Sequence, residues 1–147
     1  MKYAVLLLAA MYLKAQPADP WKPIQFLTGD WIGEGQGSPG PSQGACSFVF
    51  DLQRKVLIRK SYSESAASRH DDLMVIYFDQ TLKAVYFDSE GHVIHYTLET
   101  GPDSVRFFSE EYRLTYRKDG EKLAMDFEVA APGKPFANYL HATLRKK

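Results

Sequence analysis

The feature that most constrains the fold is a succession of short segments in which hydrophobic and polar residues alternate. The segment 122–130 is one example, because Leu123, Met125, Phe127 and Val129 are separated by single residues of other types. Such alternation places every second side chain on the same face of a β-strand. Turn-forming residues separate these segments about every 8–12 residues, which is typical of all-β proteins.

The segments with this pattern are 45–52, 55–65, 71–79, 83–90, 92–100, 104–110, 112–119, 122–130 and 137–146. With the stretch around Trp31, they make about nine or ten strands without helical stretches, which indicates a β-sandwich or a β-barrel. Short links favour the pairing of sequence neighbours, and a closed barrel leaves no exposed edge strand. We therefore predict an all-β fold, a single antiparallel up-and-down β-barrel of about ten strands.

A short helical turn is expected before the first strand. Trp21, Ile24 and Leu27 are spaced three residues apart, which places them on one face of a helical turn. Pro23 is compatible with the first turn of a helix, and Gly29 can end it.

Residues 1–16, MKYAVLLLAAMYLKAQ, have the pattern of a signal peptide. Lys2 precedes an apolar stretch over 3–13 that is shorter than the roughly 20 residues of a membrane span. A buried first helix is the alternative. We expect 1–16 to be removed, leaving one domain over 17–147 that is exported to a periplasm or out of the cell and has no transmembrane segment.

Composition and motif content argue against several classes of function. Eighteen acidic and eighteen basic residues balance, and no basic stripe of the kind that binds nucleic acid is present. Cys46 is the only cysteine, so an internal disulfide is excluded, and it is expected in the core rather than as a reactive thiol. No Gly-x-Ser-x-Gly, Cys–His or phosphate-loop motif occurs.

The stretch 26–44, FLTGDWIGEGQGSPGPSQG, combines six glycines with one tryptophan. Gly33, Gly35 and Gly37 share one face of a strand, which lets another backbone, a helical plug or a ligand come close. Glycine also permits the sharp bend of a barrel corner. A bend alone and a bend with a ligand site both remain open. Trp31 is expected to close one end of the interior, with one N–H to satisfy.

This opening resembles that of the nitrobindin-like, lipocalin-like barrels, which begin with a Leu-x-Gly-x-Trp-x-Gly-x-Gly pattern. The matching residues, with two more that also fit, are Leu27, Gly29, Trp31, Gly33, Gly35, Glu34 and Gly37. The closing stretch 112–146 is also similar to the end of that family. The middle of the chain looks more like an uncharacterised group of exported bacterial barrels that share the Gly-x-Trp-x-Gly-x-Gly opening.

The resemblance implies a ten-stranded antiparallel barrel and raises ferric haem as a cofactor, which nitrobindins hold with a histidine on the final strand. Tyr139 precedes Leu140, where the family has its histidine, and His141 follows two residues later on what would be the same strand face. Both residue types can ligate haem iron. Tyr139 and His141 are therefore the candidate haem ligands.

Histidines at other positions are less suited to a metal site. His92 and His95 are three residues apart, which places them on opposite faces of a strand. His70 lies beside Asp71 and Asp72, and a solvated loop or strand edge accounts for this cluster unless the loop folds over the barrel mouth.

Asp88, Glu90 and His92 surround a tight turn at Gly91. Turn formation alone explains these residue types. A carboxylate beside an imidazole at the barrel rim could also serve as an acid–base pair.

Arg59 could face either way. On the outer wall, which is the simpler interpretation, it would be solvated. On the lumen side it would be a buried cation that needs a partner, such as an acidic ligand group or Glu34.

The function expected from these observations is binding of a small, largely apolar molecule in the lumen. The alternatives are haem binding, an enzyme of unknown reaction that uses Arg59, Asp88 and His92, and a filled barrel acting in an envelope assembly. A non-enzymatic role is favoured, and the sequence carries no signal for oligomeric state. The candidate ligand-binding residues are Trp31, Glu34, Arg59, Tyr77, Tyr86, Asp88, His92 and Tyr96.

Overall fold

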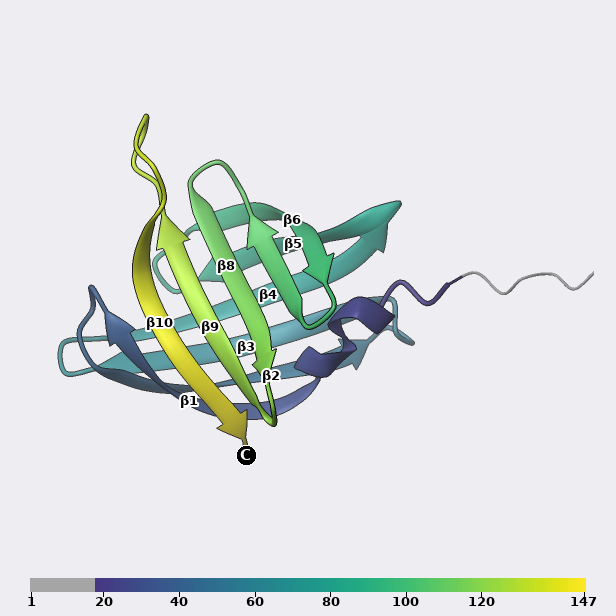
Figure 1. The fold of residues 1–147 in the computed structure, drawn as a ribbon, viewed down its shortest axis with the longest axis horizontal. Coiled ribbons are helices and arrows are strands. Elements are labelled where there is room, and N and C mark those ends of the chain that lie inside the picture. Colours follow the sequence, from purple (N-terminus) through teal and green to yellow (C-terminus); the bar gives the residue numbers. More distant parts are fainter. Residues whose placement is uncertain (1–17) are drawn as a thin grey trace, which may run out of the picture.

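Ten antiparallel strands close into one barrel in the computed structural model, which describes residues 18–147 (Figure 1). Each strand pairs with its neighbours in sequence, and β1 pairs with β10 to complete the ring. The prediction of an all-β, up-and-down barrel with a short N-terminal helical turn is confirmed. The predicted signal peptide, residues 1–16, lies outside the described residues.

The only helical element among the described residues is a 3-10 helix, η1, over Lys22–Leu27. The strands are β1 (Gly29–Gly37), β2 (Ser42–Asp51), β3 (Val56–Ser65), β4 (Arg69–Asp79), β5 (Thr81–Asp88), β6 (Val93–Gly101), β7 (Ser104–Phe108), β8 (Tyr112–Asp119), β9 (Lys122–Val129) and β10 (Ala137–Lys146). Within residues 18–147, no helix has the length and apolar character needed to cross a membrane.

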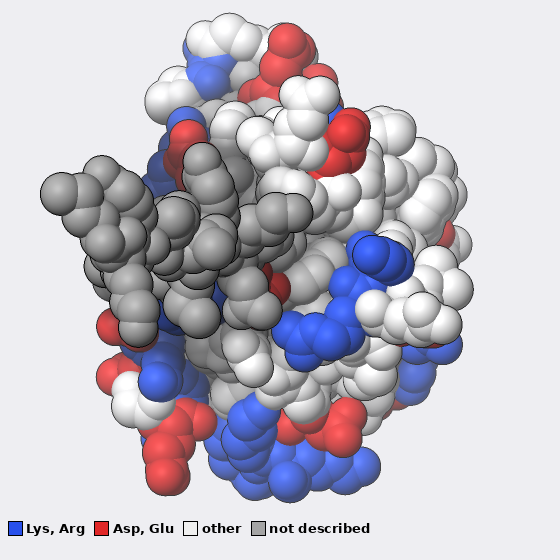
Figure 2. Space-filling view, turned by 90° about the vertical axis from the view of Figure 1, so that its right-hand side faces the viewer, with Lys and Arg blue, Asp and Glu red and all other residues white. Residues whose placement is uncertain are grey.

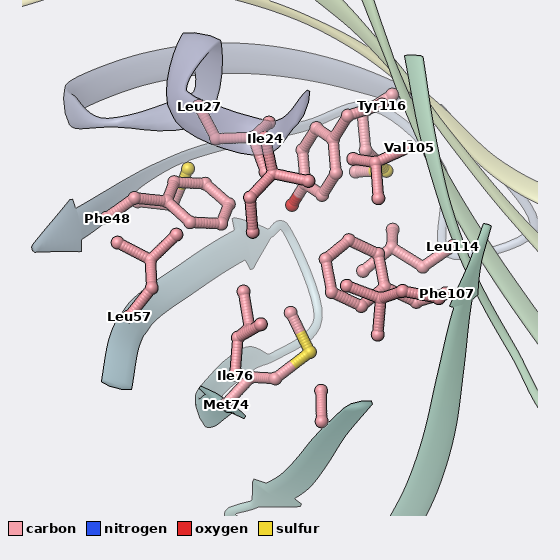
Figure 3. Close-up of a cluster of buried hydrophobic side chains, with 14 of the residues drawn as sticks. Ile24, Leu27, Phe48, Leu57, Met74, Ile76, Val105, Phe107, Leu114 and Tyr116 are labelled. Atoms are coloured by element: carbon pink, nitrogen blue, oxygen red, sulfur yellow. The ribbon is translucent and has the colours of Figure 1, made fainter. Parts of the chain in front are cut away.

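The closed end of the barrel is covered by η1. Ile24 and Leu27 are fully buried and point into a cluster that includes Phe48, Leu57 and Phe107 (Figure 3). These side chains come from strands far apart in sequence, so the cluster joins opposite walls of the barrel. The spacing of apolar residues in the helical turn therefore predicts its buried face correctly.

Trp31 lies in the same end of the barrel and is 3% exposed. Its indole Nε1–H donates to the carbonyl oxygen of Leu27 at 2.7 Å, and the ammonium of Lys146 lies 4.0 Å from its ring centroid. The single polar group of this large side chain is thus satisfied inside the core. The indole and η1 close this end of the barrel together.

The glycines of the opening stretch accommodate neighbouring strands. A Cβ atom at Gly37 would collide with the carbonyl oxygen of Tyr139 on β10, and one at Gly44 would collide with that of Tyr62 on β3. None of the glycines in β1 lines the cavity described below. Of the neighbours that a glycine face allows, which are another backbone, a helical plug or a ligand, the structure therefore supports the backbone of an adjacent strand.

Charges of both signs are visible on one face of the molecule (Figure 2), and the single cysteine lies in the core as expected. On the face shown in Figure 2, Lys and Arg side chains are interspersed with Asp and Glu side chains. Cys46 is buried, and its burial raises the pKa of the thiol to about 11. The thiol is therefore protonated at neutral pH, as suits a core residue.

Candidate ligand-binding site

A cavity of about 370 Å³ occupies the half of the lumen away from η1. Its lining comes from the ends of β3, β4, β5, β6, β8, β9 and β10 that lie opposite the closed end. Leu114 belongs both to this lining and to the core cluster, so it forms part of the cavity floor. The barrel is therefore filled at one end and hollow at the other.

One wall of the cavity is polar and is built by β3, β4 and β5. On β3, Ser61 and Ser63 follow Arg59 at every second position, so all three side chains face the lumen. His70 and Asp72 on β4 lie beside them in the sheet.

The wall built by β6, β8 and β9 is largely apolar and aromatic; β8 and β9 lie across the ring from β3 and β4, and β6 adjoins β5. Ile94 and Tyr96 come from β6, and Tyr112, Met125 and Phe127 come from β8 and β9. The rings of Tyr112 and Phe127 are stacked, with centroids 6.0 Å apart and an interplanar angle of 5°. A molecule in this cavity would contact hydrogen-bonding groups on one side and flat apolar surfaces on the other.

Arg59 is buried on the lumen side, so the interpretation that places it on the outer wall is wrong. It is 6% exposed and forms an ion pair with Asp72, whose side chain is 7% exposed. Its Nε donates to the hydroxyl of Tyr116 at 2.9 Å, and its Nη2 donates to Ser61 Oγ at 3.2 Å. Burial alone would lower the pKa of Arg59, but Asp72 raises it above its ordinary value, and the group stays charged.

Glu34 is not the partner of Arg59. It is exposed and borders a groove on the outer surface of the barrel together with Tyr62 and Arg145. Strand alternation explains the difference, because Trp31 faces the interior and Glu34, three residues later, faces outward. Asp72 is present in the sequence, but its contact with Arg59 depends on the pairing of β3 with β4, in which Asp72 stands opposite Ser61, two residues from Arg59 on the same strand face.

His70 also lines the lumen, although the sequence analysis favoured a solvated loop or strand edge for it. It belongs to β4, and its Nε2 lies 2.9 Å from the hydroxyl of Tyr86, while its Nδ1 lies 3.1 Å from Glu90 Oε1. Burial, followed by the charge of Asp72, raises the pKa of Tyr86 above its ordinary value. The Tyr86 hydroxyl is thus a neutral hydrogen-bonding group of the polar wall. The alternation of His70, Asp72 and buried Met74 was the signal that identifies this face.

Asp88 and His92 form both a turn and a carboxylate–imidazole pair at the mouth. Asp88 Oδ1 accepts the backbone N–H of Glu90 at 3.0 Å and of His92 at 2.9 Å, and Oδ2 lies 2.8 Å from His92 Nδ1. Burial would raise the pKa of Asp88, but these hydrogen bonds lower it below its ordinary value of 3.8. The same pair raises the pKa of His92 above 6.5.

These opposite shifts predict a pH window for the stabilising effect of the pair. The contribution of Asp88 is present above its unfolded pKa and is lost as pH falls through its lowered folded pKa. The contribution of His92 is present below its unfolded pKa and is lost as pH rises through its raised folded pKa. The free energy of unfolding of wild type should therefore exceed that of His92→Ala by the largest amount between about pH 4 and 6.5. Urea unfolding of both proteins across pH 3–9 measures this difference, and a difference that does not vary with pH would contradict the pairing.

Only two of the four aromatic residues in the candidate ligand-binding set line the cavity. Tyr86 and Tyr96 line the cavity, with ring centroids 6.3 Å apart. Tyr77 does not line it, because its buried neighbour Ile76 faces the lumen and Tyr77 therefore faces outward. Trp31 lies in the closed end and is not part of the lining.

The two candidate haem ligands are not brought together. Tyr139 is 41% exposed at the cavity mouth, whereas His141 is exposed and its Nδ1 lies 2.6 Å from Asp126 Oδ1 on the outer wall. The register of β10 against β9 shifts between Asn138 and Leu140, and this irregularity reverses the facing of the residues that follow. The expectation that Tyr139 and His141 share one face is wrong, and of these two candidate ligands only Tyr139 borders the cavity. Residues 18–147 also contain no cluster of three or more His, Cys, Asp or Glu side chains suited to a metal ion.

Comparison with known proteins supports the fold alone. No protein-family model and no curated protein matches the sequence. Among solved structures, the crystal structure of Rv2717c from M. tuberculosis is similar, with a TM-score of 0.65 and 17% sequence identity. The similarity covers 90% of this chain and 99% of that chain. The barrel is therefore shared across its whole length with a protein of very different sequence.

Proposed function

We propose that this chain is an exported barrel that binds one small molecule in its lumen. The observation that carries the proposal is the cavity of about 370 Å³ between a polar and an aromatic wall. Its size lies within the range of about 300–1,000 Å³ that is usual for ligand sites. The apolar body of the ligand would lie against Tyr96, Tyr112 and Phe127, and its polar end against the opposite wall.

The cost of the polar wall supports a binding role over a filled barrel. Arg59 and Asp72 are both removed from water, and a buried ion pair is often no more stabilising than apolar side chains of the same volume. The hydrophobic cluster at the closed end already ties the strands together. Charged groups retained in the lumen are therefore better explained by recognition than by stability.

An enzymatic role has less support from this geometry. Of the three candidate catalytic residues, Arg59 is occupied by Asp72, Tyr116 and Ser61. Asp88 and His92 are held in a turn that their hydrogen bonds explain.

Export is proposed from the pattern of residues 1–16. The intact mass of the secreted chain tests this proposal. A mass that includes residues 1–16 would contradict it.

The two buried methionines provide a test of lumen binding. Met125 lines the cavity, whereas Met74 lies in the closed core and is fully buried. Addition of 2-phenylethanol should shift the NMR signal of the Met125 methyl group and leave that of Met74 in place. For a ligand of this size we expect a Kd on the order of millimolar.

A matched pair of variants locates the binding. Ser63→Phe fills the cavity from the polar wall and should abolish the shift of Met125. Lys60→Phe adds the same side chain to the exposed face of the same strand and should leave it unchanged. If Met125 does not respond in wild type, or responds equally in both variants, the lumen is not the binding site.

A further inference from the structure

Two lumen carboxylates stand side by side on adjacent strands. Asp72 on β4 and Asp88 on β5 are direct cross-strand partners, and their side chains are 7% and 4% exposed. Like charges directly opposite each other in a sheet are destabilising, and more so when they are shielded from water. This arrangement therefore requires positive charge nearby.

The basic side chains present do not use all of this acceptor capacity. Arg59 pairs with Oδ1 of Asp72, and His92 with Oδ2 of Asp88 from the rim. His70 Nε2 lies 3.9 Å from Asp72 Oδ2 and 4.0 Å from Asp88 Oδ2, which is beyond hydrogen-bond distance in both cases. One nitrogen of the cavity wall is thus almost equidistant from both carboxylates, which shows that the two carboxylates are close enough to interact with a single positive group.

The charge balance of the cavity lining also favours a cation. Its carboxylates are Asp72, Asp88 and Glu90, against the single guanidinium of Arg59 and two histidines. Because Arg59 is 6% exposed and already donates to three side chains, it offers little to an anionic ligand. The lining thus holds three carboxylates and one guanidinium, so these groups together are net negative.

The opposite wall is suited to the rest of such a ligand. Tyr96 is 3% exposed, and Tyr112 and Phe127 present stacked rings to the cavity. Aromatic faces attract organic cations as well as apolar groups. We propose that the lumen binds a small organic amine, with its ammonium group at Asp72 and Asp88 and its apolar body against the aromatic wall. This inference rests on the proposed function and specifies the class of ligand.

Three probes that share one apolar body test the inference. 2-Phenylethylamine, 2-phenylethanol and 3-phenylpropionate carry an ammonium, a hydroxyl and a carboxylate group on the same ring and two-carbon link. Because hydrogen bonds to charged groups are stronger than neutral ones, the amine should bind about tenfold more tightly than the alcohol, and the carboxylate should bind most weakly. Calorimetry gives the affinities, and the Met125 methyl shift confirms the site.

The outcomes separate the two proposals. If the alcohol or the carboxylate binds as tightly as the amine, the cation site is wrong while lumen binding stands. If no probe shifts Met125, the proposed function itself fails.

A pair of carboxylate variants assigns the preference to the lumen. Asp88→Asn removes the charge but keeps an oxygen for the N–H groups of Glu90 and His92, and it should bring the amine to within about twofold of the alcohol. Asp126→Asn is the matched control, since Asp126 also pairs with a histidine, His141, but on the outer wall. An amine preference that survives Asp88→Asn overturns the inference.

A measurement on wild type covers the case in which Asp88→Asn does not fold. The groups that surround the carboxylate pair are Arg59, His70, Tyr86, Glu90 and His92. As pH falls from 8 to 5, protonation of His92, whose pKa the hydrogen bond to Asp88 raises, adds positive charge beside the carboxylates, while an alkylamine stays protonated. Amine affinity should fall several-fold and alcohol affinity should not change, whereas an amine affinity constant over this range counts against the site.

Discussion

Replacement of Arg59 by methionine is expected to lower the free energy of unfolding by about 3 kcal/mol. The side chains of Arg59 and Asp72 are both 7% exposed, and without the guanidinium the carboxylate of Asp72 loses its ion pair inside the barrel. The hydroxyl of Tyr116, which accepts from Arg59 Nε at 2.9 Å, also loses its partner. Urea denaturation followed by tryptophan fluorescence measures the change.

Two controls distinguish a buried charge from lost packing. The double variant Arg59→Met, Asp72→Leu removes both charges and should recover most of the lost stability, because a buried ion pair can often be replaced by apolar groups. Arg117→Met removes a guanidinium that is half exposed and pairs with Asp126 on the outer wall, and it should cost less than about 1 kcal/mol. A similarly small effect of Arg59→Met would show that Asp72 is solvated from the cavity.

The second large effect is expected at the closed end, where Trp31→Ala should lower the free energy of unfolding by about 4 kcal/mol. The indole is 3% exposed, and its removal leaves a large void beside η1 and frees the carbonyl oxygen of Leu27. Trp31→Phe keeps an aromatic ring and loses the 2.7 Å hydrogen bond, so an intermediate loss is expected. Thermal unfolding followed by circular dichroism measures both variants.

Tyr139→Ala is the matched control for aromatic truncation. Its side chain is 41% exposed at the open mouth, so its loss should cost less than about 1.5 kcal/mol. If Trp31→Ala costs no more than Tyr139→Ala, the indole does not close the barrel, and the account of the filled end would need to be replaced.

The strands and their order could be predicted because both depend on local features. Alternation of period two is a property of successive residues, and short links leave few ways to connect ten strands. The helical turn is equally local, since Ile24 and Leu27 are three residues apart and both are buried. The turn before β3 lies where the gap between segments 45–52 and 55–65 predicts it, although Leu52, Gln53 and Arg54 all adopt positive φ without a glycine.

The facing of some strands could not be predicted because both of their faces carry apolar residues. In β3, Leu57 is fully buried in the lumen while Ile58 faces outward, next to Val49, which is 56% exposed on β2. Neither face of such a strand is marked as the interior by hydrophobicity, so the position of Arg59 was open. On β10, the register irregularity beside Tyr139 breaks the alternation and places His141 outside.

Periodicity and the apolar residues around Trp31 were enough to predict the class of fold, the order and approximate number of strands, and the closed end. The candidate site follows only from the way the strands pair and close. Asp72 meets Arg59 across β3 and β4, and Asp88 meets Asp72 across β4 and β5. Strand register sets which residues stand opposite one another, and closure of the ring sets which face becomes the lumen, so no single segment contains either kind of information.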